Sequence, residues 1–143
     1  MSALDDIGGE ARLRDLVEHF YDLIETLPEG AHIRRLHARH HGLAHTRHEQ
    51  FNFMSGFLGG RPYYKEVHKH MDVKLIHAHI PIRQADAENW LAVMDRALDD
   101  EAHAGPHIDK LRTVLRRVAT VLINDVPDWE ETGTRQTPDV AAP

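Results

Sequence analysis

Apolar residues recur at steps of three and four along most of this chain, and this spacing constrains its fold more than any other feature. Such spacing covers one face of an α-helix, which must then be buried against another element. The first stripe follows Gly8 and Gly9, ends before Pro28, and comprises Leu13, Leu16, Val17, Phe20, Tyr21, Ile24 and Leu27. No convincing run of alternating strand residues accompanies the stripes, so the pattern predicts an all-α class.

Glycine, proline and capping residues indicate where the first helix ends and the next one begins. Thr26 and Glu29 have the spacing of a capping box, which predicts a short helix that carries Ile33 and Leu36. The stretch 37–42 has no apolar period and contains a glycine, so we expect a loop there.

Three longer helices are expected in the rest of the chain. Apolar stripes place them at about 44–58, from Asp86 onward, and after Gly105. Residues 63–72 are polar and irregular, and 73–80 fits either a short helix or a strand. We therefore expect about five helices in all.

Length, charge and cysteine content narrow the class of protein. With 143 residues the chain can form one domain that buries about 70% of its unfolded surface, which we assign to 1–126. Residues 127–143 have little to bury and are expected to be a mobile C-terminal tail. The absence of cysteine excludes a disulfide framework and a thiol nucleophile. The net charge of −6, with basic residues spread along the chain, argues against nucleic acid or an anionic membrane as partner.

The first ten residues contain no long apolar run, so we expect neither a signal peptide nor a membrane span. A cytoplasmic location follows as an expectation.

Polar side chains interrupt the apolar stripes. A buried amide or hydroxyl without a partner costs roughly 1–3 kcal/mol, so such positions need a reason. Tyr21 lies on the first stripe, Gln50 follows Thr46 by one turn on another, and Trp90 lies on a third. If these helices pack together, the phenol, the carboxamide and the indole N–H converge on one cavity suited to a small polar ligand. The alternative is that Tyr21 and Trp90 are ordinary core residues whose polar ends reach backbone carbonyls.

Histidine is unusually frequent, with 13 residues of which ten lie between His32 and His79. His77 stands out because it shares the apolar face of a short segment with Ile76 and Ile80. It is either a core residue with satisfied hydrogen bonds or an axial iron ligand. For the second function one ring nitrogen binds the metal and a backbone carbonyl holds the other.

Three motifs, in this order and spacing, resemble the group II truncated haemoglobins over about Ile7 to Leu122. They are FYDLIETLPE at 20–29, TRHEQFNFMSGFLGG at 46–60 with PYY close behind, and HAHIPI at 77–82 followed by ENWLAVM at 88–94. In that family the iron-binding histidine stands three residues before an apolar-Pro-Ile triplet and thirteen before a tryptophan. His77 satisfies both spacings and His79 satisfies neither.

The resemblance implies a compressed globin fold, a sandwich of two helices over two, around one haem b. His77 is then the iron ligand, and Tyr21, Gln50 and Trp90 match polar positions on the distal side. Thr46 stands where larger globins carry a distal histidine. Each donor aimed at a small ligand stabilises its complex by roughly 1 kcal/mol or more. Slow release of oxygen follows, which suits ligand capture or redox detoxification better than reversible oxygen transport.

Further residues are matched to the edge and faces of the haem. The resemblance assigns Arg47 and Lys74 to the propionates, because the family usually has basic residues there, and Tyr64 to the haem edge. It matches His37 to a residue that leans on the haem face, and it adds Phe53 to the haem contacts. The alternative for Arg47, Lys74 and Tyr64 is that they are solvated surface residues.

The chain departs from the family pattern just before His77. Lys69 and Met71 replace a glycine and a proline that usually flank the histidine matching His70, and Ile76 replaces a common arginine. The path of this loop therefore does not follow from the resemblance.

Oxygen and other small haem ligands are the partners that the resemblance implies, with a monomer or a weak homodimer as the assembly. The chain has no flavin domain and no nicotinamide-binding motif, so any turnover needs an external reductase. The sequence does not rank peroxidase-like activity against nitric oxide or nitrite chemistry, and we assign no dedicated enzymatic activity.

Non-haem metal binding is the alternative function. His45 and Glu49 have the H-x-x-x-E spacing of a di-iron bundle, and His37, His41 and His45 are each four apart, as zinc or nickel ligands can be. Gly42 interrupts that register, and no second such pair lies on a strongly periodic helix. A structural domain without a cofactor is a third interpretation, and it leaves Gln50 on an apolar stripe unexplained.

Overall fold

The computed structural model describes residues 2–38 and 42–127, and every regular element in these ranges is a helix. The all-α class predicted from the stripes is confirmed. Four long helices carry the fold: α2 (Gly9–Thr26), α4 (Gly42–Phe57), α7 (Gln84–Asp100) and α8 (Pro106–Val121). Shorter elements connect them: α1 (Ala3–Asp6), the 3-10 turn η1 (Pro28–Gly30), α3 (Ala31–Ala38), α5 (Tyr63–His68) and α6 (Val73–Ile76). None of the described helices is both long and apolar enough to cross a membrane.

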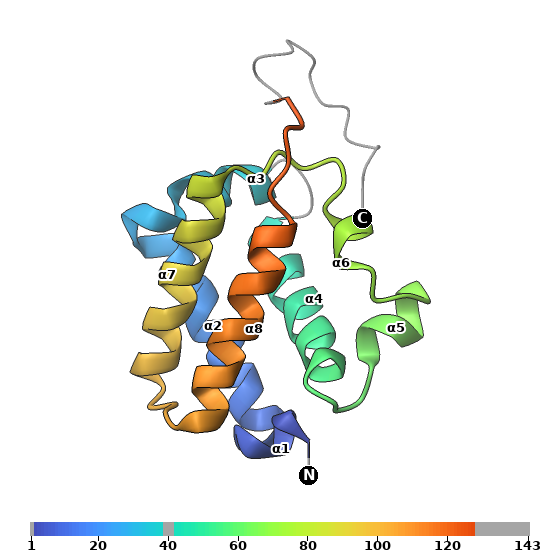
Figure 1. Ribbon diagram of the computed structural model, residues 1–143, viewed down its shortest axis with the longest axis vertical. Helices are drawn as coiled ribbons and strands as arrows, with labels where there is room; N and C mark the ends of the chain where they lie inside the picture. Colours follow the sequence, from blue (N-terminus) through green and yellow to red (C-terminus); the bar gives the residue numbers. More distant parts are fainter. Residues whose placement is uncertain (1, 39–41, 128–143) are drawn as a thin grey trace.

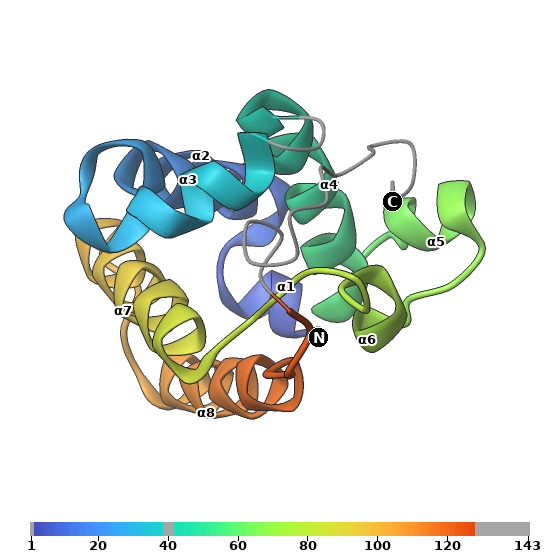
Figure 2. The same cartoon turned by 90° about the horizontal axis from the view of Figure 1, so that it is seen from above.

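The long helices form two packed pairs, α2 with α4 and α7 with α8 (Figures 1 and 2). Helix α2 joins the pairs, because it contacts α4 as well as α7. The segment between α4 and α7 includes α5 and α6, which lie on the side of α4 away from α2. The chain then passes the end of α8 before α7 begins (Figure 2). This is the two-over-two arrangement that the resemblance implies.

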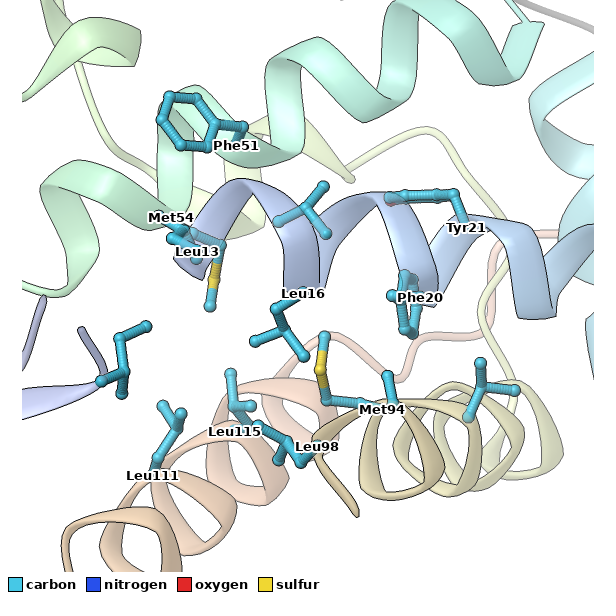
Figure 3. Close-up of a cluster of buried hydrophobic side chains, with 14 of the residues drawn as sticks. Leu13, Leu16, Phe20, Tyr21, Phe51, Met54, Met94, Leu98, Leu111 and Leu115 are labelled. Atoms are coloured by element: carbon cyan, nitrogen blue, oxygen red, sulfur yellow. The ribbon is translucent and has the colours of Figure 1, made fainter. Parts of the chain in front are cut away.

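The hydrophobic core is built around α2. Leu13, Leu16 and Phe20 are almost completely inaccessible to solvent. Figure 3 shows α2 between Phe51 of α4 on one side and side chains of α7 and α8 on the other (Met94, Leu98, Leu111, Leu115), with Met54 of α4 beside Leu13. Burial of each large apolar side chain contributes about 1.5–3 kcal/mol, so α2 is the element that holds the two pairs together.

The junction between α2 and α3 differs from the predicted capping box of Thr26 and Glu29. Thr26 is the last residue of α2, and its hydroxyl donates back to the carbonyl oxygen of Asp22 at 3.0 Å. No side chain caps η1. The turn depends instead on Gly30, which is buried so close to α2 that a Cβ there would overlap the carbonyl group of Ile24.

Both ends of the predicted loop at 37–42 are helical in the structure. His37 still belongs to α3, and α4 already begins at Gly42. Arg39, His40 and His41 lie outside the described residues. The tail predicted at 127–143 also lies outside them, except for Pro127, which is exposed and has no regular structure.

Residues 63–80, predicted to be irregular or ambiguous, contain two short helices. Helix α5 ends at His68 and is followed by Lys69, whose φ of 72° lies in the left-handed region that glycine adopts most easily. The chain thus keeps a glycine-type turn although a lysine occupies the position. Helix α6 follows directly, and the Asp72 carboxylate caps it by accepting from Leu75 N at 3.0 Å. The choice between helix and strand at 73–80 is therefore decided in favour of a short helix and a turn.

The chain after α8 is fastened to the segment that follows α6. Asn124 Nδ2 donates to the carbonyl oxygen of Ile80 at 2.9 Å, and its Oδ1 accepts from Ile82 N at 3.2 Å. The backbone N–H of Asn124 donates to the carbonyl oxygen of Ile82 at 2.9 Å. We call these three bonds the Asn124 clasp. They hold residues 80–82 beside the end of α8.

Candidate functional site

A cavity of about 290 Å³ lies among α2 to α8. Its apolar lining consists of Ile33, Leu36, Phe53, Met54, Phe57, Val73, Ile76, Ile80, Ile82, Ala87, Leu115, Val118, Ala119 and Leu122. Its polar lining consists of Tyr21, His37, His45, Thr46, Glu49, Gln50, Tyr64, His77, Asp86 and Trp90. An apolar cavity with a few polar groups is typical of a site for a cofactor or small molecule.

His77 follows α6 directly and presents a fixed imidazole to the cavity. Its Nδ1 lies 2.8 Å from the carbonyl oxygen of Val73, so this nitrogen carries the proton and donates it there. Nε2 then holds a lone pair, and the only side-chain hydrogen bond of His77 among the described residues is the one through Nδ1. Burial lowers the pKa of His77, and the bond to Val73 offsets only part of this effect. A neutral imidazole that a backbone carbonyl orients through its other nitrogen is suited to bind a metal ion.

Tyr21 of α2 and Gln50 of α4 form a polar pair in the same cavity. The buried phenol donates to Gln50 Oε1 at 3.2 Å. Burial raises the pKa of Tyr21 in spite of the nearby Arg47 charge, so the phenol stays protonated. Since a phenol has only one proton to donate, the bond to Gln50 uses it, and the carboxamide NH₂ of Gln50 remains as a donor.

Trp90 and Thr46 differ in the hydrogen-bonding groups that they present to the cavity. The indole of Trp90 packs on Phe20 with ring centroids 5.2 Å apart, and its N–H has no hydrogen-bond partner within residues 2–38 and 42–127. It is therefore a second available donor. The hydroxyl of Thr46 donates to the carbonyl oxygen of Gly42 at 2.9 Å, so Thr46 offers the cavity only an acceptor.

Three more predicted residues line the cavity. His37 stands edge-on to Tyr21 with ring centroids 6.2 Å apart, and its Nδ1 lies 3.0 Å from the carbonyl oxygen of Ile33. Phe53 and Tyr64 meet edge to face with centroids 5.4 Å apart. Residues from α2, α3, α4, α5 and α7 that the sequence analysis placed around one ligand are thus brought together.

Arg47 and Lys74 lie outside the cavity lining. Arg47 reaches from α4 to α2, where its guanidinium is bound by acidic side chains. Lys74 is exposed and borders a separate depression beside α6 and the end of α8. This arrangement gives no support to their expected contacts with propionates, which stay predictions.

A polar cluster between α4 and α5 was missed by the sequence analysis. Glu49 lines the cavity, and its Oε1 lies 2.6 Å from His68 Nε2 and 4.0 Å from His45 Nε2. The His68 ring also lies against Tyr64, with centroids 4.2 Å apart. The H-x-x-x-E spacing identified two members of this cluster, but His68 enters it only because residues 63–68 are helical.

The described part of the chain contains no site that would support the di-iron alternative. There, no group of three or more histidine, aspartate and glutamate side chains is arranged to hold a metal ion. His41, one of the candidate ligands, lies outside the described residues.

Two pairs of helices around an apolar cavity, into which a neutral histidine presents a free lone pair, define a protein of the globin class. The residues also fit a haem, since an apolar lining accepts the macrocycle and His77 Nε2 is free to bind iron.

Comparison with known proteins agrees with this class. The model of the bacterial-like globin family matches residues 2–124. Group 2 truncated hemoglobin YjbI of Bacillus subtilis (strain 168) is 33% identical over 91 residues, which cover 64% of this chain and 65% of that protein. The aligned part is thus slightly less than two thirds of that relative.

Solved structures show the same relationship over a longer stretch. The group II 2-on-2 hemoglobin of Agrobacterium tumefaciens has a TM-score of 0.81 and 30% identity, covering 87% of this chain and 95% of its own. The truncated oxygen-avid haemoglobin of Bacillus subtilis has a TM-score of 0.77 and 29% identity, covering 87% and 100%. The chain belongs to the bacterial-like globin family and groups with the group II truncated haemoglobins within it. The fold class inferred from the resemblance is confirmed.

Proposed function

We propose that this chain holds one haem b in the cavity, with His77 as the iron ligand, and binds oxygen and other small diatomic or anionic ligands there. Haem iron supplies the position at which such ligands bind. The observation that carries the proposal is the half-buried imidazole of His77 in the cavity wall, whose Nδ1 donates to the carbonyl oxygen of Val73 at 2.8 Å while Nε2 is free. Globin family membership supports the same assignment.

The distal side chains would hold the small ligand by hydrogen bonds. The carboxamide of Gln50 and the indole N–H of Trp90 are the available donors, and Tyr21 orients the carboxamide through Oε1. Each bond of about 1 kcal/mol slows ligand release by roughly fivefold. The solved Bacillus subtilis relative is described as oxygen-avid, which agrees with slow release.

Slow release favours ligand capture or redox detoxification over oxygen delivery. We assign no dedicated enzymatic activity, and turnover would depend on an external reductase. The proposal includes a single globin domain at 1–126, a monomer or weak homodimer, and a cytoplasmic location.

Absorption spectroscopy tests the haem assignment. The purified protein should be red with a Soret band, and His77→Gly should lose haem or its bond to the iron. His79→Gly is the matched control, because this histidine lacks both family spacings, and it should retain the Soret band. A colourless protein that contains two non-haem irons would refute the proposal.

Oxygen dissociation kinetics test the distal residues. Tyr21→Phe and Gln50→Leu should each speed oxygen release by about fivefold, the effect of one hydrogen bond. Thr46→Val should change the rate less, since the Thr46 hydroxyl donates within α4. Unchanged rates in both Tyr21→Phe and Gln50→Leu would show that the ligand is held elsewhere.

A further inference from the structure

Arg47 is held by three carboxylates of the neighbouring helix. Its guanidinium donates to Glu18 Oε1 at 2.6 Å, to Asp22 Oδ1 at 2.9 Å and to Glu25 Oε2 at 2.7 Å. It also donates to the carbonyl oxygen of Glu18 at 3.0 Å. Only 16% of the Arg47 side chain is exposed. We call Arg47 with these three acids the Arg47 cradle.

The Arg47 cradle and the Tyr21–Gln50 hydrogen bond join the same two helices. The three acids stand at helical spacing on one face of α2, next to Tyr21. The guanidinium carbon lies 5.9 Å from the centroid of the Tyr21 ring. Gln50 follows Arg47 by three residues on α4 and so shares its face. The position of α4 against α2 therefore determines both contacts.

We propose that Arg47 is a positioning residue that holds α4 against α2 so that the Tyr21 hydroxyl reaches Gln50 Oε1. The Tyr21–Gln50 distance of 3.2 Å is already long for a bond between two oxygens, so a small further separation breaks it. The inference rests on the proposed function, because it concerns the donors that face the ligand. In the part of the chain that the structure describes, the ion pairs of Arg47 all lie on α2, so the positioning role does not require a contact with a propionate.

The negative charge of the three acids on α2 explains why an arginine is needed at position 47. Without a cation, the three carboxylates repel one another at helical spacing, and nothing draws α4 toward them. A single exposed ion pair contributes little, whereas one largely buried guanidinium shared by three acids restrains the helix pair. Lysine keeps the charge but lacks the planar group that bonds to several acids at once. Arg47→Lys should therefore have an intermediate effect, and Arg47→Gln the full one.

Arg112 provides a matched control in the same chain. It bridges α8 to α7 through Asp95 at 2.5 Å and Asp99 at 2.9 Å. It does not line the cavity. Arg112→Gln thus removes a comparable interhelical arginine without touching the Tyr21–Gln50 pair.

The experiment measures oxygen dissociation from the haem-containing variants together with the NMR signal of the Gln50 side-chain amide. Arg47→Gln should speed oxygen release by about fivefold, as Tyr21→Phe does, and should shift the amide signal. Arg112→Gln should change neither. Thermal melting of both arginine variants shows that they remain folded at the temperature of the measurement.

A double-variant cycle separates this inference from the proposed function. If Arg47 acts through Tyr21, then Tyr21→Phe with Arg47→Gln releases oxygen at the same rate as Tyr21→Phe alone. Rates that multiply would place the action of Arg47 elsewhere and overturn the inference. If Tyr21→Phe itself has no effect, the distal assignment in the proposed function fails, and the amide signal alone decides on Arg47. If Tyr21→Phe speeds release but Arg47→Gln changes neither readout, only the positioning role of Arg47 is refuted.

Discussion

Replacing Asn124 by alanine should destabilise the protein by about 2 kcal/mol. The variant removes the two side-chain bonds of the Asn124 clasp, to Ile80 O at 2.9 Å and from Ile82 N at 3.2 Å. It also removes two bonds within the chain end itself, from Val126 N at 3.1 Å and to Leu122 O at 3.4 Å. A net contribution of about 1 kcal/mol from each of the two clasp bonds gives the total, since the two bonds within the chain end fasten nothing to the rest of the fold. The segment is only partly buried, so water can reach the freed groups and the larger penalty of a dry, unpaired group does not apply.

Urea unfolding followed by circular dichroism measures this change. Thr113→Ala is the control, because its exposed hydroxyl bonds only within α8, to the carbonyl oxygen of Asp109. It should change the free energy of unfolding by less than about 0.5 kcal/mol. In thermal melting, the 2 kcal/mol expected for Asn124→Ala corresponds to a loss of roughly 6–10 °C in Tm.

A result for Asn124→Ala that equals the Thr113→Ala control would refute the reasoning. It would mean that the bonds to the Asn124 backbone, from Asn124 N to Ile82 O and from Arg83 Nη1 to Asn124 O, suffice to fasten the segment. A loss far above 3 kcal/mol would contradict it as well, because that size requires a buried cavity or an unpaired group that water cannot reach.

Two further predictions concern acid stability and packing. Burial, assisted by the Arg12 charge, lowers the pKa of His103 from 6.5, so the unfolded chain takes up a proton there before the folded chain does. Stability is therefore lost as the pH falls below about 6.5, and His103→Gln should show a smaller drop in Tm between pH 7 and pH 5; an equal drop contradicts this. Gly30→Ala should cost more than about 2 kcal/mol, measured by urea unfolding, because its Cβ overlaps the rigid carbonyl of Ile24. Wild-type stability in that variant would show that η1 can shift.

The long helices could be predicted, and a metal-ligand candidate could be proposed, because both depend on local patterns. An apolar stripe must be buried wherever the partner comes from, so the stripes on α2, α4, α7 and α8 predict helices without knowledge of the packing. The choice of His77 over His79 came from spacing to the proline and tryptophan that follow. In the structure His77 is the residue with Nδ1 bonded to Val73 in the cavity wall.

Features that depend on contacts between different helices of the chain were not predictable in the same way. Thr26 can cap a following helix or bond back into its own, and the close approach of Gly30 to α2 favours the second. Helix α5 is too short for an apolar period to appear, so the contact of His68 with Glu49 could not be anticipated.

The partner of Arg47 is a different case, because a signal for it was present. One face of the first predicted helix carries three acids, Glu18, Asp22 and Glu25. Because like charges at this spacing repel one another, a basic side chain from a neighbouring helix is expected to bind there. The pattern predicts that some basic residue binds there, but only the packing of α4 on α2 identifies which one.

The segment that carries His77 is anchored quite differently from the rest of the molecule. Helix α6 has no buried residue, and Leu75 is 58% exposed, whereas α2 lies in the middle of the core. Local opening is cheapest where few apolar contacts must be broken, so amide hydrogens should exchange fastest around α6 and slowest in α2. During folding, the cavity wall formed by α2 can therefore be in place before the segment that carries His77 closes the cavity. A ligand bond at His77 would then complete the tertiary structure as well as the binding site.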